Sequence, residues 1–170
     1  MNGSQELWWQ QARSDHEAFE VLRSQGIAQC HDLHYLQMVT EKLAKAYFWR
    51  SNSPPPKSHS GFVQFLRFLG QIRHTKDRKR IANLFSFHRF IDFQKWARQI
   101  LPLAYSLERL APDLARSGPN PEYPWPHDRP QTAPVNYRFE LWQILNSHRG
   151  REFLRIIHIA IVKFPEYADI

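Results

Sequence analysis

The feature that most constrains the fold is residues 30–50, CHDLHYLQMVTEKLAKAYFWR, which contain neither Gly nor Pro and have a clear helical period. Apolar residues recur here at spacings of three and four, which is typical of an amphipathic helix with one buried face. At ~1.5 Å per residue such a helix is roughly 30 Å long, the width of a small domain. Other helices must cover its apolar side, formed by Leu33, Leu36, Val39, Thr40, Leu43, Ala46 and Tyr47.

A polar line runs along another side of this expected helix. His34, Gln37, Glu41 and Lys45 follow one another at the same spacings, and Glu41 precedes Lys45 by four residues. Such an i,i+4 pair stabilises an isolated helix by about 0.2–0.5 kcal/mol. We expect this line to be a solvated face of the helix.

Other apolar stretches of the chain also repeat with a helical period. Ser4 is the expected N-cap of the first helix, and Gly26 is expected to end it. Residues 81–110 indicate one long helix or two joined pieces, with a kink at Pro102 because proline removes a backbone donor. The expected helices are residues 4–24, 30–50, 60–74, 81–110, 136–146 and 150–164.

Two proline-rich stretches interrupt this pattern. Residues 51–59 contain three consecutive prolines, which cannot continue the preceding helix. Residues 112–135 contain seven prolines, and a loop of this length is uncommon inside a compact domain. We expect an ordered, extended segment held against the helices by Tyr123, Trp125 and Tyr137. The fold predicted for residues 1–170 is a single all-α domain, an antiparallel bundle of five or six helices.

The cysteine count and the hydropathy pattern indicate where the chain works. A single cysteine, Cys30, excludes an intrachain disulfide and favours a reducing compartment. Residues 1–11 lack the basic and apolar regions of a secretory signal, and no stretch of 18 apolar residues occurs. We therefore expect a cytoplasmic protein without a membrane segment.

The chain is strongly basic, with a formal net charge of +7. Sixteen Arg against seven Lys favour planar, bidentate contacts with phosphate or carboxylate groups, and the excess favours a nucleic-acid partner. The densest basic run is residues 73–80, RHTKDRKR, which indicates a phosphate-binding surface or, equally well, a solvated turn between helices. Its expected phosphate-binding residues are Arg73, Lys76, Arg78, Lys79 and Arg80.

The last expected helix contains the pattern most informative for function. Residues 151–164, REFLRIIHIAIVKF, are apolar on almost every side, but Arg151, Arg155 and His158 align on one narrow line. Cleavage of RNA through its own 2′-hydroxyl needs a proton acceptor that titrates near neutral pH and a cation for the phosphorane charge. Arg151 and His158 are the candidate catalytic residues, and Arg155 is a candidate phosphate contact. Glu152 is an acid expected to neutralise Arg151.

Two parts of the chain resemble the HEPN family, a group of small all-helical prokaryotic toxins, their partners and nucleotide-binding modules. Residues 11–50 are similar to its first two helices, and the KSH of residues 57–59 is similar to the short link into its third helix. HEPN ribonucleases carry an Arg, then four to six residues, then a His, and six residues separate Arg151 from His158. The matching positions in the first two helices are Ala12, Asp15, Gln37, Glu41, Lys42, Ala44, Lys45 and Ala46.

This resemblance implies a metal-independent endoribonuclease of toxin or defence type that works without a cofactor. In such an enzyme Arg151 would hold the scissile phosphate and His158 would transfer a proton or polarise the 2′-hydroxyl, in a groove composed by a homodimer. The same resemblance also implies a second class, a non-catalytic module that binds a nucleotide, RNA, or a nucleotidyltransferase or antitoxin partner.

Other residue patterns of the chain offer alternatives to this site. Arg67 and His74 also have six residues between them, beside the basic run, and are an alternative pair. His31 and His34 lie one helical turn apart, but no third ligand is placed near them, so no metal site is expected. The chain has no Gly-rich phosphate loop, HExxH, CxxC or GxSxG pattern, which argues against the common NTPase, zinc-protease and hydrolase classes.

Overall fold

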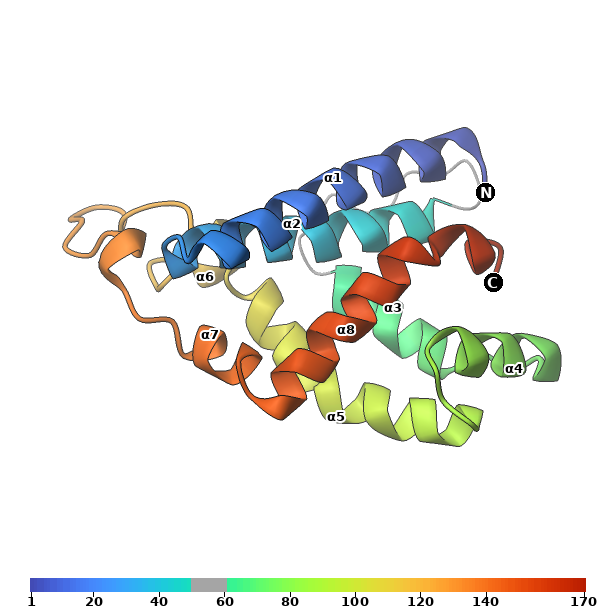
Figure 1. Ribbon diagram of the computed structural model, residues 1–170. Coiled ribbons are helices and arrows are strands. Elements are labelled where there is room, and N and C mark those ends of the chain that lie inside the picture. Colours follow the sequence, from blue (N-terminus) through green and yellow to red (C-terminus); the bar gives the residue numbers. More distant parts are fainter. Residues whose placement is uncertain (50–60) are drawn as a thin grey trace.

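The computed structural model describes residues 1–49 and 61–170, where regular secondary structure is helical apart from one isolated β-bridge between Trp125 and Thr132. The predicted all-α bundle is confirmed for these residues (Figure 1). They form eight α-helices rather than five or six, because short segments expected to be turns or loops are helical. The helices are α1 (Gly3–Gln25), α2 (Gln29–Phe48), α3 (Gly61–Gly70), α4 (Thr75–Leu84), α5 (Phe90–Glu108), α6 (Pro112–Ala115), α7 (Glu140–Leu145) and α8 (His148–Val162), with 3-10 turns at Pro134–Asn136 and Phe164–Glu166.

α1 and α2 form a long antiparallel hairpin, blue and cyan in Figure 1. The N-cap of α1 is Asn2 rather than the predicted Ser4. The Asn2 side chain accepts a hydrogen bond from the Gln5 backbone N–H, and the Gln5 side chain accepts one from the Asn2 N–H, so two orphan donors are satisfied together. Gly26 ends α1 in the left-handed region with φ of 64°, which glycine adopts without strain.

The middle of the chain is divided differently from the sequence prediction. α3 ends at Gly70 rather than at residue 74, and α4 begins at Thr75, inside the basic run. Ser86, with φ of 63°, lies in the break between α4 and α5. α5 then continues through Pro102 as one element. Residues 81–110 therefore contain two separate helices, the end of α4 and α5.

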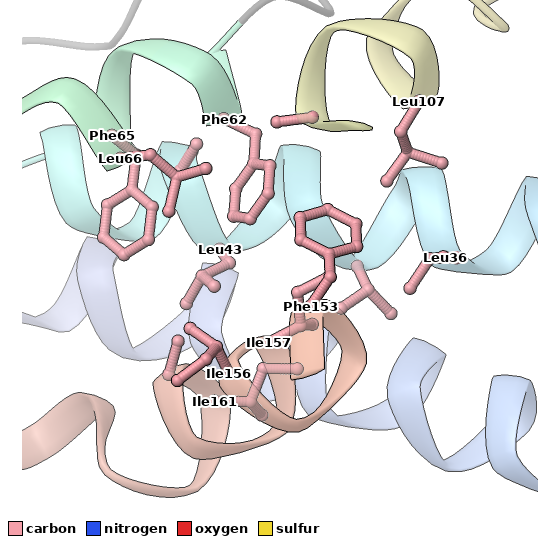
Figure 2. Close-up of a cluster of buried hydrophobic side chains, with 14 of the residues drawn as sticks. Leu36, Leu43, Phe62, Phe65, Leu66, Leu107, Phe153, Ile156, Ile157 and Ile161 are labelled. Carbon is pink, nitrogen blue, oxygen red and sulfur yellow. The ribbon is translucent and has the colours of Figure 1, made fainter. Parts of the chain in front are cut away.

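The buried hydrophobic side chains form one connected cluster, to which α8 contributes five residues. α8 contacts α1, α2, α5 and α7. Figure 2 shows its Phe153 and Ile157 among side chains of α2, α3 and α5. Burying each such side chain contributes about 1.5–3 kcal/mol relative to leaving it exposed. The buried positions of α8 are Gly150, Phe153, Ile156, Ile157, Ala160 and Ile161, so only one side of the helix remains for its polar line.

Gly150 allows α8 to begin in contact with the end of α7. A Cβ atom at Gly150 would lie 2.2 Å from the carbonyl oxygen of Ile144, which is far inside van der Waals contact. Ser147 caps α8 by accepting a hydrogen bond from the Gly150 N–H. Arg151 is thereby placed in the first turn of α8, next to the junction with α7.

The proline-rich segment is packed onto the bundle by Trp125. The Trp125 ring is buried. It packs edge-on against the Tyr137 ring and is tilted relative to the Phe139 ring. Glu122 of the segment approaches His34 of α2, with 3.4 Å between carboxylate and imidazole. Tyr123, expected to help hold the segment, is instead 57% exposed.

Within residues 1–49 and 61–170, no helix combines the length and the apolar character needed to cross a bilayer. The KSH link at residues 57–59 lies outside the described residues, as do the predicted helix boundaries at Arg50 and Ser60.

Candidate functional site

The polar line of α8 faces α1 across a surface depression. Arg151, Arg155 and His158 line it together with Glu20 and Arg23 of α1, and Leu154 completes the lining. Its volume is about 450 Å³. The α1/α8 depression thus gathers all three α8 residues that the sequence singled out, and it adds a third arginine that the sequence did not.

Two of these arginines are held by the α7–α8 junction. An Arg151 Nη atom donates a 2.7 Å hydrogen bond to the Asn146 carbonyl oxygen, and an Arg23 Nη atom donates a 3.2 Å bond to the Asn146 side-chain oxygen. The Arg23 guanidinium also lies over the rings of Phe19 and Trp142. Because one residue ties down both side chains, their positive charges are directed into the same depression.

Glu152 does not pair with Arg151, contrary to the prediction. Its carboxylate accepts hydrogen bonds from Arg155 at 3.1 and 3.2 Å, an i,i+3 ion pair on α8. The adjacent residue on a helix points about 100° away, whereas the residue three positions on lies on the same side. Of the two candidate phosphate-binding arginines on α8, Arg155 is therefore the one that Glu152 partly neutralises.

His16 of α1 is a second histidine at this site, and sequence reasoning missed it. Its ring centroid lies 5.2 Å from that of His158, and its Nε2 lies 3.6 Å from a carboxylate oxygen of Glu20. The residue is only 8% exposed. Burial lowers the pKa of His16 below its ordinary value, and the neighbouring His158 acts in the same direction, while Glu20 and Glu17 oppose it. No spacing in the sequence relates residues so far apart in the chain.

Asp32 of α2 is a buried carboxyl group near Arg23. It is 1% exposed, and its Oδ1 has no hydrogen-bond partner among the described residues. Burial raises its pKa to about 6, against the opposing charges of Arg23 and His31. Asp32 is thus a titratable group whose charge reaches one of the arginines of the α1/α8 depression.

The basic run contributes less free charge than the sequence suggested. Arg78 Nε donates to the Ile72 carbonyl oxygen at 2.7 Å, and its guanidinium lies over Phe90. Arg80 makes a bidentate ion pair with Asp169 at 3.0 and 3.2 Å, which holds the pKa of that carboxyl below its usual value. The remaining predicted phosphate-binding residues of the run, Arg73, Lys76 and Lys79, are exposed.

The basic run and the α1/α8 depression are separate surfaces. Arg80 is bound to Asp169, which follows the C-terminal end of α8, whereas Arg151 lies in the first turn of that helix. At ~1.5 Å per residue the length of α8 separates these two ends by roughly 20 Å. The depression extends along α8 as far as His158, but no residue of the basic run lines it. The structure therefore does not bring the eight predicted site residues into one place.

Arg67 and His74 do not share a helix, contrary to the alternative pairing. α3 ends at Gly70, and His74 is the exposed N-cap residue of α4. The Arg67 guanidinium instead lies over the ring of Tyr105 and donates a 3.3 Å hydrogen bond to its hydroxyl oxygen. The helical spacing that made this pair a candidate is lost at the break between α3 and α4.

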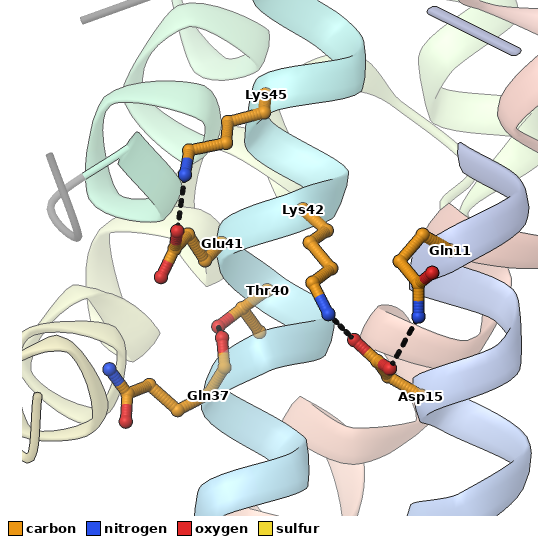
Figure 3. Close-up of polar contacts among 7 residues, drawn as sticks. All are labelled: Gln11, Asp15, Gln37, Thr40, Glu41, Lys42 and Lys45. Atoms are coloured by element: carbon orange, nitrogen blue, oxygen red, sulfur yellow. Dashed lines mark hydrogen bonds and ion pairs between the residues drawn. The ribbon is translucent and has the colours of Figure 1, made fainter. Parts of the chain in front are cut away.

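The polar residues that resemble the HEPN pattern are not a solvated face, since Asp15, Gln37 and Glu41 are buried and Lys42 and Lys45 are half-buried. Figure 3 shows their contacts. Asp15 of α1 pairs with Lys42 of α2 and accepts a 3.0 Å bond from Gln11, and Glu41 pairs with Lys45. Glu41 and Gln37 are buried, so the predicted solvated face is wrong for both. Neither side-chain amide atom of Gln37 has a hydrogen-bond partner among the described residues.

A larger cavity, of about 1120 Å³, lies between α5, α6 and α7, and the sequence did not indicate it. We call it the α5/α7 cavity. Its lining combines apolar side chains with two tyrosines, two arginines and three acidic residues, which are the buried Glu108 together with Asp113 and Glu140. Glu108 accepts a 2.8 Å hydrogen bond from the Val63 N–H, and burial raises its pKa. The tyrosines and arginines are Tyr105, Tyr137, Arg109 and Arg116.

Metal ligands are not grouped in the part of the chain that the structure describes, where no three His, Cys, Asp or Glu side chains could hold an ion. The residues define an all-α bundle with an arginine-lined, histidine-bearing depression between its first and last long helices. No family model matches the chain, and no curated protein or solved structure is significantly similar to it.

Proposed function

We propose that this chain is a HEPN-like RNA-targeting protein of toxin or defence type that cleaves RNA without a metal ion. The observation that supports the proposal is the α1/α8 depression, where Arg151, Arg155 and Arg23 converge around His158. Three guanidinium groups favour a phosphate-bearing ligand, and the exposed imidazole beside them can serve as a general base.

The proposed reaction is attack of a ribose 2′-oxygen on the adjacent phosphorus. His158 takes the 2′-hydroxyl proton, the new bond from the 2′-oxygen to phosphorus forms, and the bond to the 5′-oxygen breaks. Arg151 holds the phosphate and stabilises the negative charge that accumulates on it in the transition state. Arg155 and Arg23 supply further contacts along the RNA backbone.

The test is cleavage of a fluorescent single-stranded RNA in the presence of EDTA. His158→Ala removes the proton acceptor, and general acid–base groups typically contribute a factor of about 10²–10⁴ in rate. His148→Ala is a matched control, because His148 is an exposed histidine on the same helix that does not line the depression. Wild-type cleavage by a folded His158→Ala variant would show that this site is not catalytic.

A homodimer is part of the same proposal. Val162 lies one turn after His158 on α8 and is 53% exposed, so an apolar side chain continues the polar line at the surface. A twofold axis beside α8 brings two copies of the depression together in one groove and doubles its positive charge. Solution scattering over a concentration series tests this, and a monomer at the highest concentration contradicts it.

The second candidate is a non-catalytic module that binds a nucleotide, RNA, or a nucleotidyltransferase or antitoxin partner. The α5/α7 cavity favours it, since tyrosine rings can stack on a base and arginines can bind phosphate. Calorimetric titration with AMP and ATP separates the two candidates. Binding that is lost in Arg109→Ala and retained in His158→Ala, without RNA cleavage by the wild type, supports the module.

A further inference from the structure

His16 packs against His158, and it also contacts Phe19 and the carboxylate of Glu20 on its own helix. It comes from α1, is almost fully buried, and contacts the His158 ring at 5.2 Å between centroids with the planes inclined by 47°. It does not line the α1/α8 depression, whereas His158 does. A substrate in the depression would therefore contact His158 directly, whereas His16 lies behind His158 and Glu20.

We propose that His16 is a positioning residue for His158, which orients the His158 imidazole toward the depression and leaves it the single proton-carrying member of the pair. This inference rests on the proposed function, because it assigns a role within the same site. It adds a residue from the opposite end of the chain to the pair that the sequence indicated.

The charges around His16 indicate which of the two histidines, His16 or His158, takes up the proton. Glu20 and Glu17 act on it from α1, and His158 acts on it from α8; Arg23, Arg151 and Arg155 line the depression above. Burial disfavours the charged form of His16, and two imidazolium rings in contact would repel each other. His16 therefore stays neutral while His158 takes up the 2′-hydroxyl proton, and Glu20, which lies 3.6 Å from His16 Nε2, lines the same depression as His158.

In the proposed step the proton moves from the 2′-hydroxyl to His158 only. The bond from the 2′-oxygen to phosphorus forms, the bond from phosphorus to the 5′-oxygen breaks, and the 5′-oxygen takes a proton from solvent. His16 neither gains nor loses a proton during this step. Its contribution is geometric and electrostatic, so its loss should lower kcat without raising KM.

Two substitutions separate ring contact from titration. His16→Ala removes the ring and should lower kcat about ten- to a hundredfold at neutral pH, because small misplacements of a catalytic group are costly. His16→Phe keeps a neutral ring of similar shape and should recover most of that loss. At acid pH the wild type should lose activity with a two-proton slope, since both rings must be neutral, and His16→Phe with a one-proton slope.

A histidine titration by NMR tests the coupling without relying on activity or on a folded His16 variant. In the wild-type chain the pKa of His16 should lie below the ordinary histidine value, and His158→Ala should raise it by removing a like charge. An unchanged His16 titration in His158→Ala overturns the inference.

The kinetic outcomes separate the two proposals. Cleavage at the wild-type rate by His158→Ala defeats the proposed function itself. If His158 is essential, then wild-type kcat in His16→Ala, an equal loss in His16→Phe and His16→Ala, or a two-proton slope in His16→Phe defeats only the role of His16.

Discussion

The basic run on α4 and the α1/α8 depression differ in how many of their positive charges are available to a ligand. The sequence, judged by its density of basic residues, would favour the run, but the structure favours the depression. The run has the densest positive charge in the chain, yet Arg78 is bonded to a backbone carbonyl and Arg80 to Asp169. The last helix carries only two arginines on its polar line, yet α1 adds a third to the same depression. Adjacent basic residues are dispersed around a helix, whereas separate helices can direct their side chains to one point.

The largest expected effect tests whether the depression is the functional surface. Arg151→Ala should reduce RNA cleavage about a hundredfold or more, because it removes the cation that stabilises the transition-state charge. Arg149→Ala, two residues earlier on α8 and outside the depression, should stay within about twofold of wild type. Rates from single-turnover cleavage decide the matter. Equal losses in the two variants would mean that only general charge near α8 counts.

A smaller effect is expected from the exposed lysines of the basic run. The double variant Lys76→Ala and Lys79→Ala should weaken binding to all RNA sequences alike. It should also reduce the slope of the logarithm of the binding constant against the logarithm of the salt concentration by about one to two. The cleavage rate of bound RNA should not change. Fluorescence anisotropy at several salt concentrations measures both quantities. If the double variant instead abolishes cleavage of saturating RNA, the run belongs to the catalytic surface.

Asp32, buried near Arg23 of the depression, should make the stability of the folded chain depend on pH. Its folded-state pKa of about 6 lies above the ordinary value, so the folded state binds the proton more tightly than the unfolded state does. The free-energy cost of burying the ionised Asp32 carboxylate is therefore largest above pH 6 and disappears as the pH falls toward 4. Asp32→Asn should raise Tm by about 2–4 °C at pH 7.5 and by less at pH 4.5. Equal shifts at both values would show that Asp32 is not a buried anion.

The smallest effect is expected at the ion pair that ties α4 to the C-terminal segment. Arg80 and Asp169 are both partly exposed, and such pairs contribute about 0.2–1 kcal/mol. Because Asp169 has a lowered pKa, its contribution is present above the ordinary Asp value and is lost as the pH falls through the folded-state pKa. Denaturant unfolding of Arg80→Ala at pH 7 and pH 3 measures it. A loss of several kcal/mol would indicate a larger structural role.

Much of the helical architecture was readable because helix period and capping are local properties. The 30–50 stretch predicted α2 within two residues at each end, and the apolar face of residues 150–164 predicted the buried side of α8. The break between α3 and α4 was expected at residues 75–80 but lies at residues 71–74, since basic residues such as Lys76 and Arg80 are as compatible with a helix as with a turn. The burial of Gln37 and Glu41 was also missed, because a polar line on a helix does not reveal what packs against it.

The sequence alone determined that the chain is helical and that Arg151, Arg155 and His158 share one line, because 3.6 residues per turn decide which side chains are neighbours on a helix. Only the tertiary structure decided that this line faces Glu20 and Arg23 across a depression, that His16 lies against His158, and that Glu152 pairs with Arg155. Those relations depend on how α1 packs on α8, and packing between distant segments leaves no periodic trace in the chain.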